Sequence, residues 1–317
     1  MHHPTPYRQT GVALVLVLWI LGLMTIMAGS YSLTTHREAE LLQHAHERTK
    51  ALAIADAGIH YAMLMLSLQD AKSRWRTDGE PYYWEAEGTR VRINILDEGG
   101  KIDLNAAQEP TLRKVLSLIL RNDDQAMRLT DVIIDWRDAD NLKRTHGAEA
   151  EDYQAAGLEQ TPRNRNFLTL EEFRGVLGIT PELYQKLEPW FTLYTGQEAL
   201  NPMKATRDIL LVLSGGDVAA VNNYLFQRRQ SQVGTQGQPG QSPAPAAVPF
   251  ASQSGLNLQG SSDMAYTIFS QVEVSGRPIA GIRATVKRNA GKANEPFFFL
   301  NWKETGFPRK PDDTTEH

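Results

Sequence analysis

The feature that most constrains this chain is an uncharged apolar run from Gly11 to Ala28. Between Val12 and Ala28 it is long enough for roughly 26 Å of helix, which can span a bilayer core with slight thinning. The leader before it carries Arg8 as its one certain positive charge. Because positive charge favours the cytoplasmic side of a membrane, the pattern predicts a cytoplasmic leader and an exported bulk.

A long helix is predicted to continue beyond this run. Apolar and small residues recur at steps of three or four as far as Leu66, which is the spacing of one helical face. We therefore predict one continuous helix from Val12 to about Trp75. The alternative is a secretory signal cut near Ser30, where small residues form a loose cleavage site.

Composition and motif searches exclude several classes of site. The 317 residues contain no cysteine, which rules out disulfides, thiolate zinc sites and a cysteine nucleophile. A net charge of −4 gives no overall basic field for nucleic acid. The segment 201–216 resembles hairpins that grip DNA, but Asp217 follows where a basic residue would help, so no nucleic-acid partner is predicted. Neither a nucleophile elbow nor a P-loop is present, so we predict that the protein is not an enzyme.

Two regions far apart in the sequence have strand character. Residues 82–87 and 89–96 predict a hairpin around Gly88. Three further strands are predicted near the end of the chain, at 265–274, 279–286 and 296–302. The most economical arrangement is a single sheet that packs on the N-terminal helix.

The region between these strands is predicted to be helical. Apolar residues at helical spacing indicate helices within 111–136, 169–176, 181–192 and 204–213. Residues 231–262 are instead rich in Gln, Gly, Ser and Pro, and predict a mobile loop.

The densest group of carboxylates lies within residues 135–152. Its members are Asp135, Asp138, Asp140, Glu149, Glu151 and Asp152. Oxygen ligands on a flexible loop suit calcium, which accepts six to eight oxygens in irregular geometry. The spacing is not that of an EF-hand, and a solvated acidic loop would explain the same residues. His146 has no second histidine or cysteine at ligand spacing, so we predict an exposed loop residue rather than a zinc ligand or general base.

The order of these features resembles the K-type minor pseudopilins (the GspK family) of the type II secretion system. The leader, the apolar run and the long helix are similar to those of pilins in general. The segments DEGGKIDLNAA (97–107) and IIDWRDADNLKRTHGAEAEDY (133–153) carry the narrower likeness. The resemblance implies cleavage by a prepilin peptidase between Gly11 and Val12. Most pilins have a glutamate where this chain has Leu16, and its absence is typical of the K type.

The resemblance implies an α+β fold, with a pilin-like long N-terminal helix packed on an antiparallel sheet and a large all-α domain inserted between strands. The expected segments are a prepilin leader (1–11), the transmembrane part of the helix (12–33), the spine helix and first strands (34–102), the inserted helical domain (103–228), a flexible loop (229–263), the last strands (264–304) and a tail (305–317).

The function that the resemblance implies is structural. A protein of this kind caps the tip of the periplasmic pseudopilus and helps to initiate its assembly for export of folded proteins. It is held by one helix in the inner membrane, with its bulk in the periplasm. The implied partners are the I and J minor pseudopilins, the major pseudopilin filament and the prepilin peptidase.

The resemblance also narrows the candidate site residues. K-type members that bind calcium in the helical domain favour a structural calcium ion here. The expected ligands are Asp138, Asp140 and Glu149, followed by Asp135 and Glu151. The expected partner contacts are Leu16, Leu52, Ile59, Met63 and Leu66. The alternative function is an exported calcium-dependent binding protein or hydrolase with a cleaved signal peptide.

Overall fold

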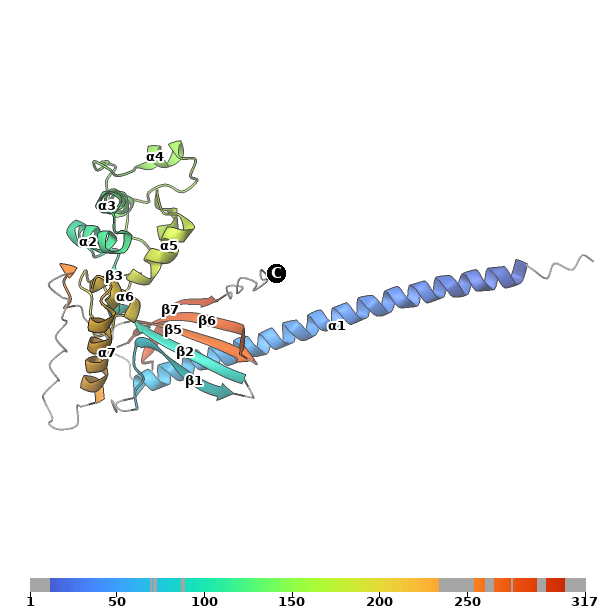
Figure 1. Cartoon of the computed structure of the whole chain (residues 1–317). Coiled ribbons are helices and arrows are strands. Elements are labelled where there is room, and N and C mark those ends of the chain that lie inside the picture. Colours follow the sequence, from blue (N-terminus) through green and yellow to red (C-terminus); the bar gives the residue numbers. More distant parts are fainter. Residues whose placement is uncertain are drawn as a thin grey trace, which may run out of the picture. The chain divides into compact units, whose positions relative to one another are not determined.

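Figure 1 shows the computed structural model of the chain, which describes residues 12–68, 70, 73–86, 89–233, 254–259, 265–274, 276–289 and 295–305. The chain divides into two compact units, Met1–Ala53 and Ile54–His317. The described part of the first unit is helical throughout, and the second unit holds the sheet and the remaining helices.

Helix α1 (Val12–Ser67) confirms the predicted long helix, although it ends before Trp75. The Trp75 ring instead stacks on Tyr82 of strand β1 (Asp78–Ala86), with the ring centroids 4.2 Å apart. It also meets Tyr61 of α1 edge-on at 5.3 Å. The sequence prediction was too long because these aromatic contacts compete with helix continuation through a polar segment.

The first part of α1 is long and apolar enough to cross a membrane. The segment Leu14–Leu33 has a mean hydropathy of 2.1, and none of it is buried. The Thr25 hydroxyl donates to the Leu21 carbonyl at 2.8 Å, so this polar group is satisfied within the helix. These properties fit a single-pass membrane anchor.

The last turns of α1 present small and apolar residues to the sheet. Ala55, Ile59 and Ala62 have no exposed surface, and Leu66 is almost fully buried. Gly58 permits the closest approach, because a Cβ atom at this position would lie 2.3 Å from Ser270 Oγ. The helix therefore packs closely enough to cover one face of the sheet.

Within the described residues, the sheet has five strands in the order β1-β2-β5-β6-β7, and every neighbouring pair is antiparallel. Its bounds are β1 (Asp78–Ala86), β2 (Thr89–Asp97), β5 (Ala265–Val274), β6 (Arg277–Arg288) and β7 (Phe297–Glu304). Strand β2 pairs with β5, so two strands far apart in the sequence become neighbours in the centre (Figure 1). The predicted α+β fold with an insertion between strands is therefore confirmed.

The insertion is mainly helical. Its helices are α2 (Glu109–Leu120), α3 (Asp123–Arg137), α4 (Ala150–Ala155), α5 (Pro181–Leu187), α6 (Arg207–Leu213) and α7 (Val218–Val233). Its short elements are η1 (Glu98–Gly100), η2 (Leu170–Gly175), η3 (Glu188–Trp190) and the parallel strands β3 (Ile102–Asp103) and β4 (Phe191–Thr192).

Several elements of the insertion differ from the prediction. The predicted helix over 169–176 is a 3₁₀ helix, and the one over 181–192 stops as an α-helix at Leu187. Pro189 follows two residues later and lacks the amide that would continue the α-helical bonding. Helix α7 runs past the predicted domain boundary at residue 228, while most of the predicted loop at 231–262 lies outside the described residues.

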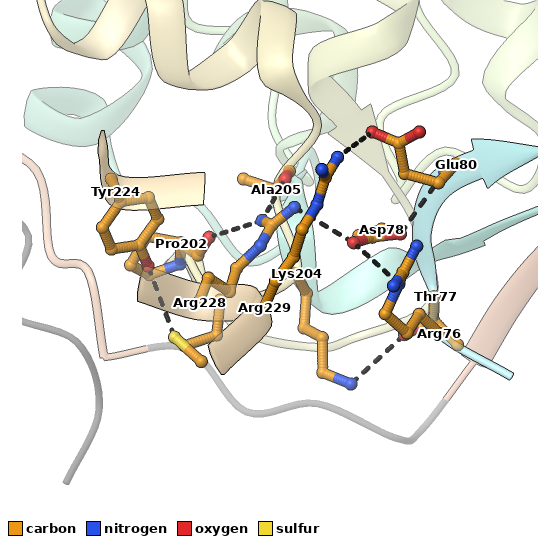
Figure 2. Close-up of polar contacts among 12 residues, drawn as sticks. Arg76, Thr77, Asp78, Glu80, Pro202, Lys204, Ala205, Tyr224, Arg228 and Arg229 are labelled. Atoms are coloured by element: carbon orange, nitrogen blue, oxygen red, sulfur yellow. Dashed lines mark hydrogen bonds and ion pairs between the residues drawn. The ribbon is translucent and has the colours of Figure 1, made fainter. Parts of the chain in front are cut away.

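A buried arginine joins the end of the insertion to the first strand (Figure 2). The Arg228 guanidinium donates to the carbonyls of Ala205 at 2.8 Å and Pro202 at 3.2 Å. It also lies 3.4 Å from the Asp78 carboxylate, and both side chains are only 3% exposed. Two carbonyls and a carboxylate thus satisfy a charge that would be costly to bury alone. We call Arg228, Asp78 and these two carbonyls the arginine clamp.

Candidate functional site

The carboxylates singled out in the sequence lie around the connection between α3 and α4. Trp136, in the last turn of α3, is buried between aromatic rings, with Phe167 stacked at 6.1 Å and Tyr153 tilted at 5.5 Å. This contact fixes the end of α3. Asp138 is the C-cap of α3 and Glu149 is the N-cap of α4, so both stand at helix ends.

Asp135 lies at the base of this connection and has no exposed surface. One oxygen, Oδ2, accepts a hydrogen bond from the Arg144 backbone N–H at 3.2 Å. The other, Oδ1, has no hydrogen-bond partner, and Arg144 Nε lies 3.9 Å away. Burial raises the pKa of Asp135, and the nearby Asp138 carboxylate adds to the increase.

Gly147 closes the connection over Asp135. A Cβ atom at position 147 would lie 1.8 Å from Asp135 Oδ2, so only glycine fits against this carboxylate. The sequence pattern gave no sign of this contact. It keeps the loop backbone close to the buried carboxylate.

Two further carboxylates leave buried oxygens without a partner. Asp138 Oδ1 and Glu149 Oε1 are both buried and have no hydrogen bond. Burial raises the pKa of each group; neighbouring carboxylates add to the increase, Asp140 for Asp138 and Asp135 first for Glu149. Three carboxylates that each keep one buried oxygen without a hydrogen bond, and that repel one another, form an acidic centre suited to a cation. We call Asp135, Asp138 and Glu149 the acidic centre.

The other two predicted ligands, Asp140 and Glu151, are exposed. Asp140 is exposed and its Oδ1 accepts from the Leu142 N–H at 2.8 Å. Glu151 is exposed on the first turn of α4. As the side chains stand in the described part of the chain, no three His, Cys, Asp or Glu residues are arranged to hold a metal ion. A cation at the acidic centre would therefore need backbone or water oxygens as well as carboxylates.

Sequence reasoning missed the polar residues that surround the acidic centre. His146 is exposed as predicted, yet its Nδ1 lies 3.1 Å from Asp131, which is buried on α3. Arg144 pairs with Glu109 at 2.8 Å and lies within 3.8 Å of Asp131. A step of four residues from Asp131 to Asp135 places both on one face of α3, which is the signal that could have identified Asp131.

The expected partner contacts on α1 also need correction. Ile59 and Leu66 are buried inside this chain, so the prediction that they face a partner is wrong. The side of α1 that they occupy is covered by this chain's own sheet, which periodicity alone could not distinguish from a partner. Leu52 and Met63 are partly exposed, and Leu16 is 58% exposed. Of the predicted processing site, Val12 begins α1, while Gly11 lies outside the described residues.

Comparisons with known proteins agree on one family. Residues 89–196, from β2 to beyond β4, match the family model described as "Type II secretion system (T2SS), protein K". Type II secretion system protein K of Pectobacterium carotovorum subsp. carotovorum is 26% identical over 205 residues, covering 58% of this chain and 62% of that protein. The protein K of Klebsiella pneumoniae is 26% identical over 230 residues, covering 63% and 69% respectively.

A solved structure has the same fold. It is described as the GspK-GspI-GspJ complex of enterotoxigenic Escherichia coli, and the match has a TM-score of 0.56 at 17% identity. It covers 83% of this chain and 98% of the other chain. None of the comparisons supports the alternative of an exported hydrolase. In sequence over residues 89–196 and in fold, this chain is therefore similar to the protein K family of the type II secretion system.

Proposed function

We propose that this protein is a minor pseudopilin that caps the tip of the periplasmic pseudopilus and helps to initiate its assembly for type II secretion. The observation that carries the proposal is a helical insertion between the strands of a sheet that follows a long apolar helix, in a chain that matches the protein K family model over residues 89–196. Its role would then lie in its surfaces and not in catalysis. The solved relative was crystallised with GspI and GspJ, which supports I-type and J-type minor pseudopilins as partners. A filament of major pseudopilin would lie below them.

Leu16 supports a position at the tip. In a pilin-like filament, a glutamate at this place neutralises the terminal amine of a neighbouring subunit, because a buried amine without a counter-charge is costly. A subunit with nothing above it has no such amine to neutralise. The helical insertion would also obstruct another subunit stacking on top. Leu16→Glu should therefore leave secretion unchanged, whereas longer filaments in this variant would contradict the cap.

The proposed location is the inner membrane, with one span and the second unit in the periplasm. The exposed apolar segment Leu14–Leu33 supports the span. Prepilin peptidase would cut between Gly11 and Val12 and keep that segment. Mass spectrometry of the full chain purified from membranes should give a terminus at Val12. A terminus near Ser30 would mean that the anchor is removed, and would contradict the filament model.

We also propose that the acidic centre holds a structural calcium ion. Its three unpartnered buried oxygens support this, and calcium accepts such oxygens together with backbone carbonyls and water. Asp135, Asp138 and Glu149 would be the main ligands, with Asp140 able to turn inward from its exposed position. Glu151 is the weakest of the predicted ligands because it is exposed and stands apart on α4. The ion would neutralise the carboxylates and fix the connection between α3 and α4.

Thermal melting of the full chain in detergent tests the calcium proposal. Calcium at 100 times its dissociation constant should add about 2.7 kcal/mol of stability, and a chelator should remove it. Asp138→Asn should weaken this response, while the matched variant Glu151→Gln should keep it. An identical melting midpoint for the wild-type protein with calcium and with chelator would refute a structural ion.

A further inference from the structure

The insertion and the sheet have separate hydrophobic cores. Within the described residues, the buried apolar side chains of the insertion form one cluster between Ile102 and Leu256, which contains no residue of α1 or of the five-stranded sheet. Val91 of the sheet lies instead beside Gly58 of α1, and Ile93 shares the face of Val91. The insertion is therefore held against the sheet mainly by contacts of another kind.

Ion pairs join the insertion to the β1 side of the sheet (Figure 2). Here the sheet supplies carboxylates and the insertion supplies cations. Asp78 lies 3.4 Å from Arg228, and Glu80 lies 2.8 Å from Arg229. Both arginines belong to α7.

Ion pairs of reversed sign join the insertion to the β6–β7 side. Arg283 of β6 pairs with Glu188 of η3 at 2.5 Å. Lys303 of β7 lies 3.5 Å from Glu171 of η2. Because the sheet is acidic at one side of the contact and basic at the other, the charges favour one orientation of the insertion on the sheet.

The two sides differ in how firmly they hold the insertion. On the β1 side, Arg228 and Asp78 are each 3% exposed. Lys204 adds a pair at 3.6 Å with Asp97, which has no exposed side-chain surface and is followed directly by the insertion. On the β6–β7 side, the four paired side chains are 24% to 58% exposed. Exposed ion pairs contribute little to stability and are screened by salt, so this side is the weaker one.

A cavity lies between the insertion and the sheet on the weaker side. It has about 30 Å³ open to the centres of water molecules, which is room for roughly two of them. Both parts contribute to its lining: Thr267, Thr285 and Asn301 from the sheet, and Leu170, Tyr184, Leu193 and Tyr194 from the insertion. An interface that is not closely packed loses few direct contacts when it opens.

We propose that the insertion hinges on the arginine clamp and opens from the β6–β7 side of the sheet. The clamp and the chain connection at Asp97 stay in place, while the pairs of Arg283 and Lys303 separate and are solvated. Interfaces of this polar kind within one chain commonly permit relative motion. The hinge changes the angle of the insertion while the sheet keeps its packing on α1. It follows from contacts within this chain and does not depend on the proposed function.

Distances between spin labels test the hinge in the full chain in detergent. Because the chain has no cysteine, two introduced cysteines are labelled uniquely. The β7 label pair is Gln185→Cys on α5 with Leu300→Cys on β7, and the β1 label pair is Gln230→Cys on α7 with Glu85→Cys on β1. All four positions are exposed.

Reversing both carboxylates of the insertion on the weaker side should open the hinge. In Glu171→Lys with Glu188→Lys, each new lysine faces a cation of the sheet. The distance within the β7 label pair should increase by roughly 5 Å or more, beyond the range of a salt bridge, while that within the β1 label pair stays the same. An unchanged β7 label pair, or an equal increase in both pairs, would overturn the hinge.

Glu80→Lys is the matched control, because it reverses an exposed carboxylate on the β1 side. It should change neither distance, since the buried clamp still holds that side. An increase within the β1 label pair in this variant would contradict the clamp as the pivot.

The wild-type charges provide a second measurement that does not depend on how the variants fold. In about 1 M salt the screening length falls to about 3 Å, so the exposed ion pairs weaken. A longer distance within the β7 label pair should then appear beside the shorter one. The same single distance at low and high salt would overturn the proposal.

Discussion

The arginine clamp and the acidic centre both bury charged side chains, yet the clamp pairs opposite charges and the acidic centre groups like charges. In the clamp, two carbonyls and the Asp78 carboxylate surround Arg228. In the acidic centre, Asp135, Asp138 and Glu149 each keep a buried oxygen without a hydrogen bond. The clamp brings opposite charges together within this chain, whereas the acidic centre groups like charges, for which we propose a cation as the partner. Burial of charge therefore indicates a ligand only where the chain fails to supply the partners.

The largest expected effect is at the clamp. Arg228→Met leaves the buried Asp78 carboxylate with only the partly exposed Arg76, 3.6 Å away, as a counter-charge. The change should cost up to about 3–5 kcal/mol in the free energy of unfolding. Arg229→Met is the matched control, because Arg229 pairs with Glu80 at 2.8 Å on the surface, with both side chains more than 40% exposed. That exposed pair should contribute about 0–1 kcal/mol. Denaturant unfolding measures the loss of stability in both variants. Equal losses would contradict the distinction between the buried and the exposed ion pair.

Gly147→Ala tests how tightly the loop closes over the acidic centre. The added Cβ overlaps the Asp135 carboxylate, and the resulting strain should cost about 1–3 kcal/mol. The variant should also lose the stabilisation by calcium, because the loop can no longer approach Asp135. Thr145→Ala, at an exposed position of the same loop, should keep both properties. Thermal melting with calcium and with chelator compares the two variants.

Neutralising one carboxylate in the arginine clamp and one in the acidic centre should have different effects on stability. Asp78→Asn removes the counter-charge of Arg228 and should destabilise the protein with or without calcium. Asp135→Asn removes a repulsive charge, so with chelator it should be neutral or slightly stabilising. With calcium, the same change should be destabilising by about 1–3 kcal/mol, the usual loss when a charged partner is removed. If Asp78→Asn and Asp135→Asn each lose the same stability with calcium and with chelator, the contrast between the clamp and the acidic centre would be wrong.

The smallest expected effect is on the pH dependence of folding stability. The raised pKa values of Asp135, Asp138 and Glu149 mean that the folded protein binds protons more readily than the unfolded chain. With chelator, this contribution to stability should rise as the pH falls from 7 through the raised pKa values, and level off below the ordinary carboxylate range. With calcium the sign should reverse, because protons displace the ion. The difference between the wild-type and Asp135→Asn melting curves isolates the share that comes from Asp135.

Much of the fold could be predicted from local patterns. The strands at β5, β6 and β7 were predicted within a few residues, because alternation and β-branched residues are local properties. Helix α4 was not predicted, because it is short and its capping box joins Glu149 and Asp152, two residues that suggested only an acidic loop. The identity of the acidic residues was visible, but their unpartnered oxygens depend on how α3, α4 and Gly147 pack together.

The sequence by itself determined the apolar anchor, the long helix that follows it, and the separation of the strands by a helical insertion. These features arise from residues close to one another in the chain, whose spacing sets helix or strand. Only the tertiary structure decided that Ile59 and Leu66 face the chain's own sheet, and that Arg228 reaches Asp78. An apolar helix face can pack on a distant part of the same chain or on another protein, and local periodicity does not distinguish the two. The exposed edge at β7 has the same origin, since a strand becomes an edge only through the pairing of the others.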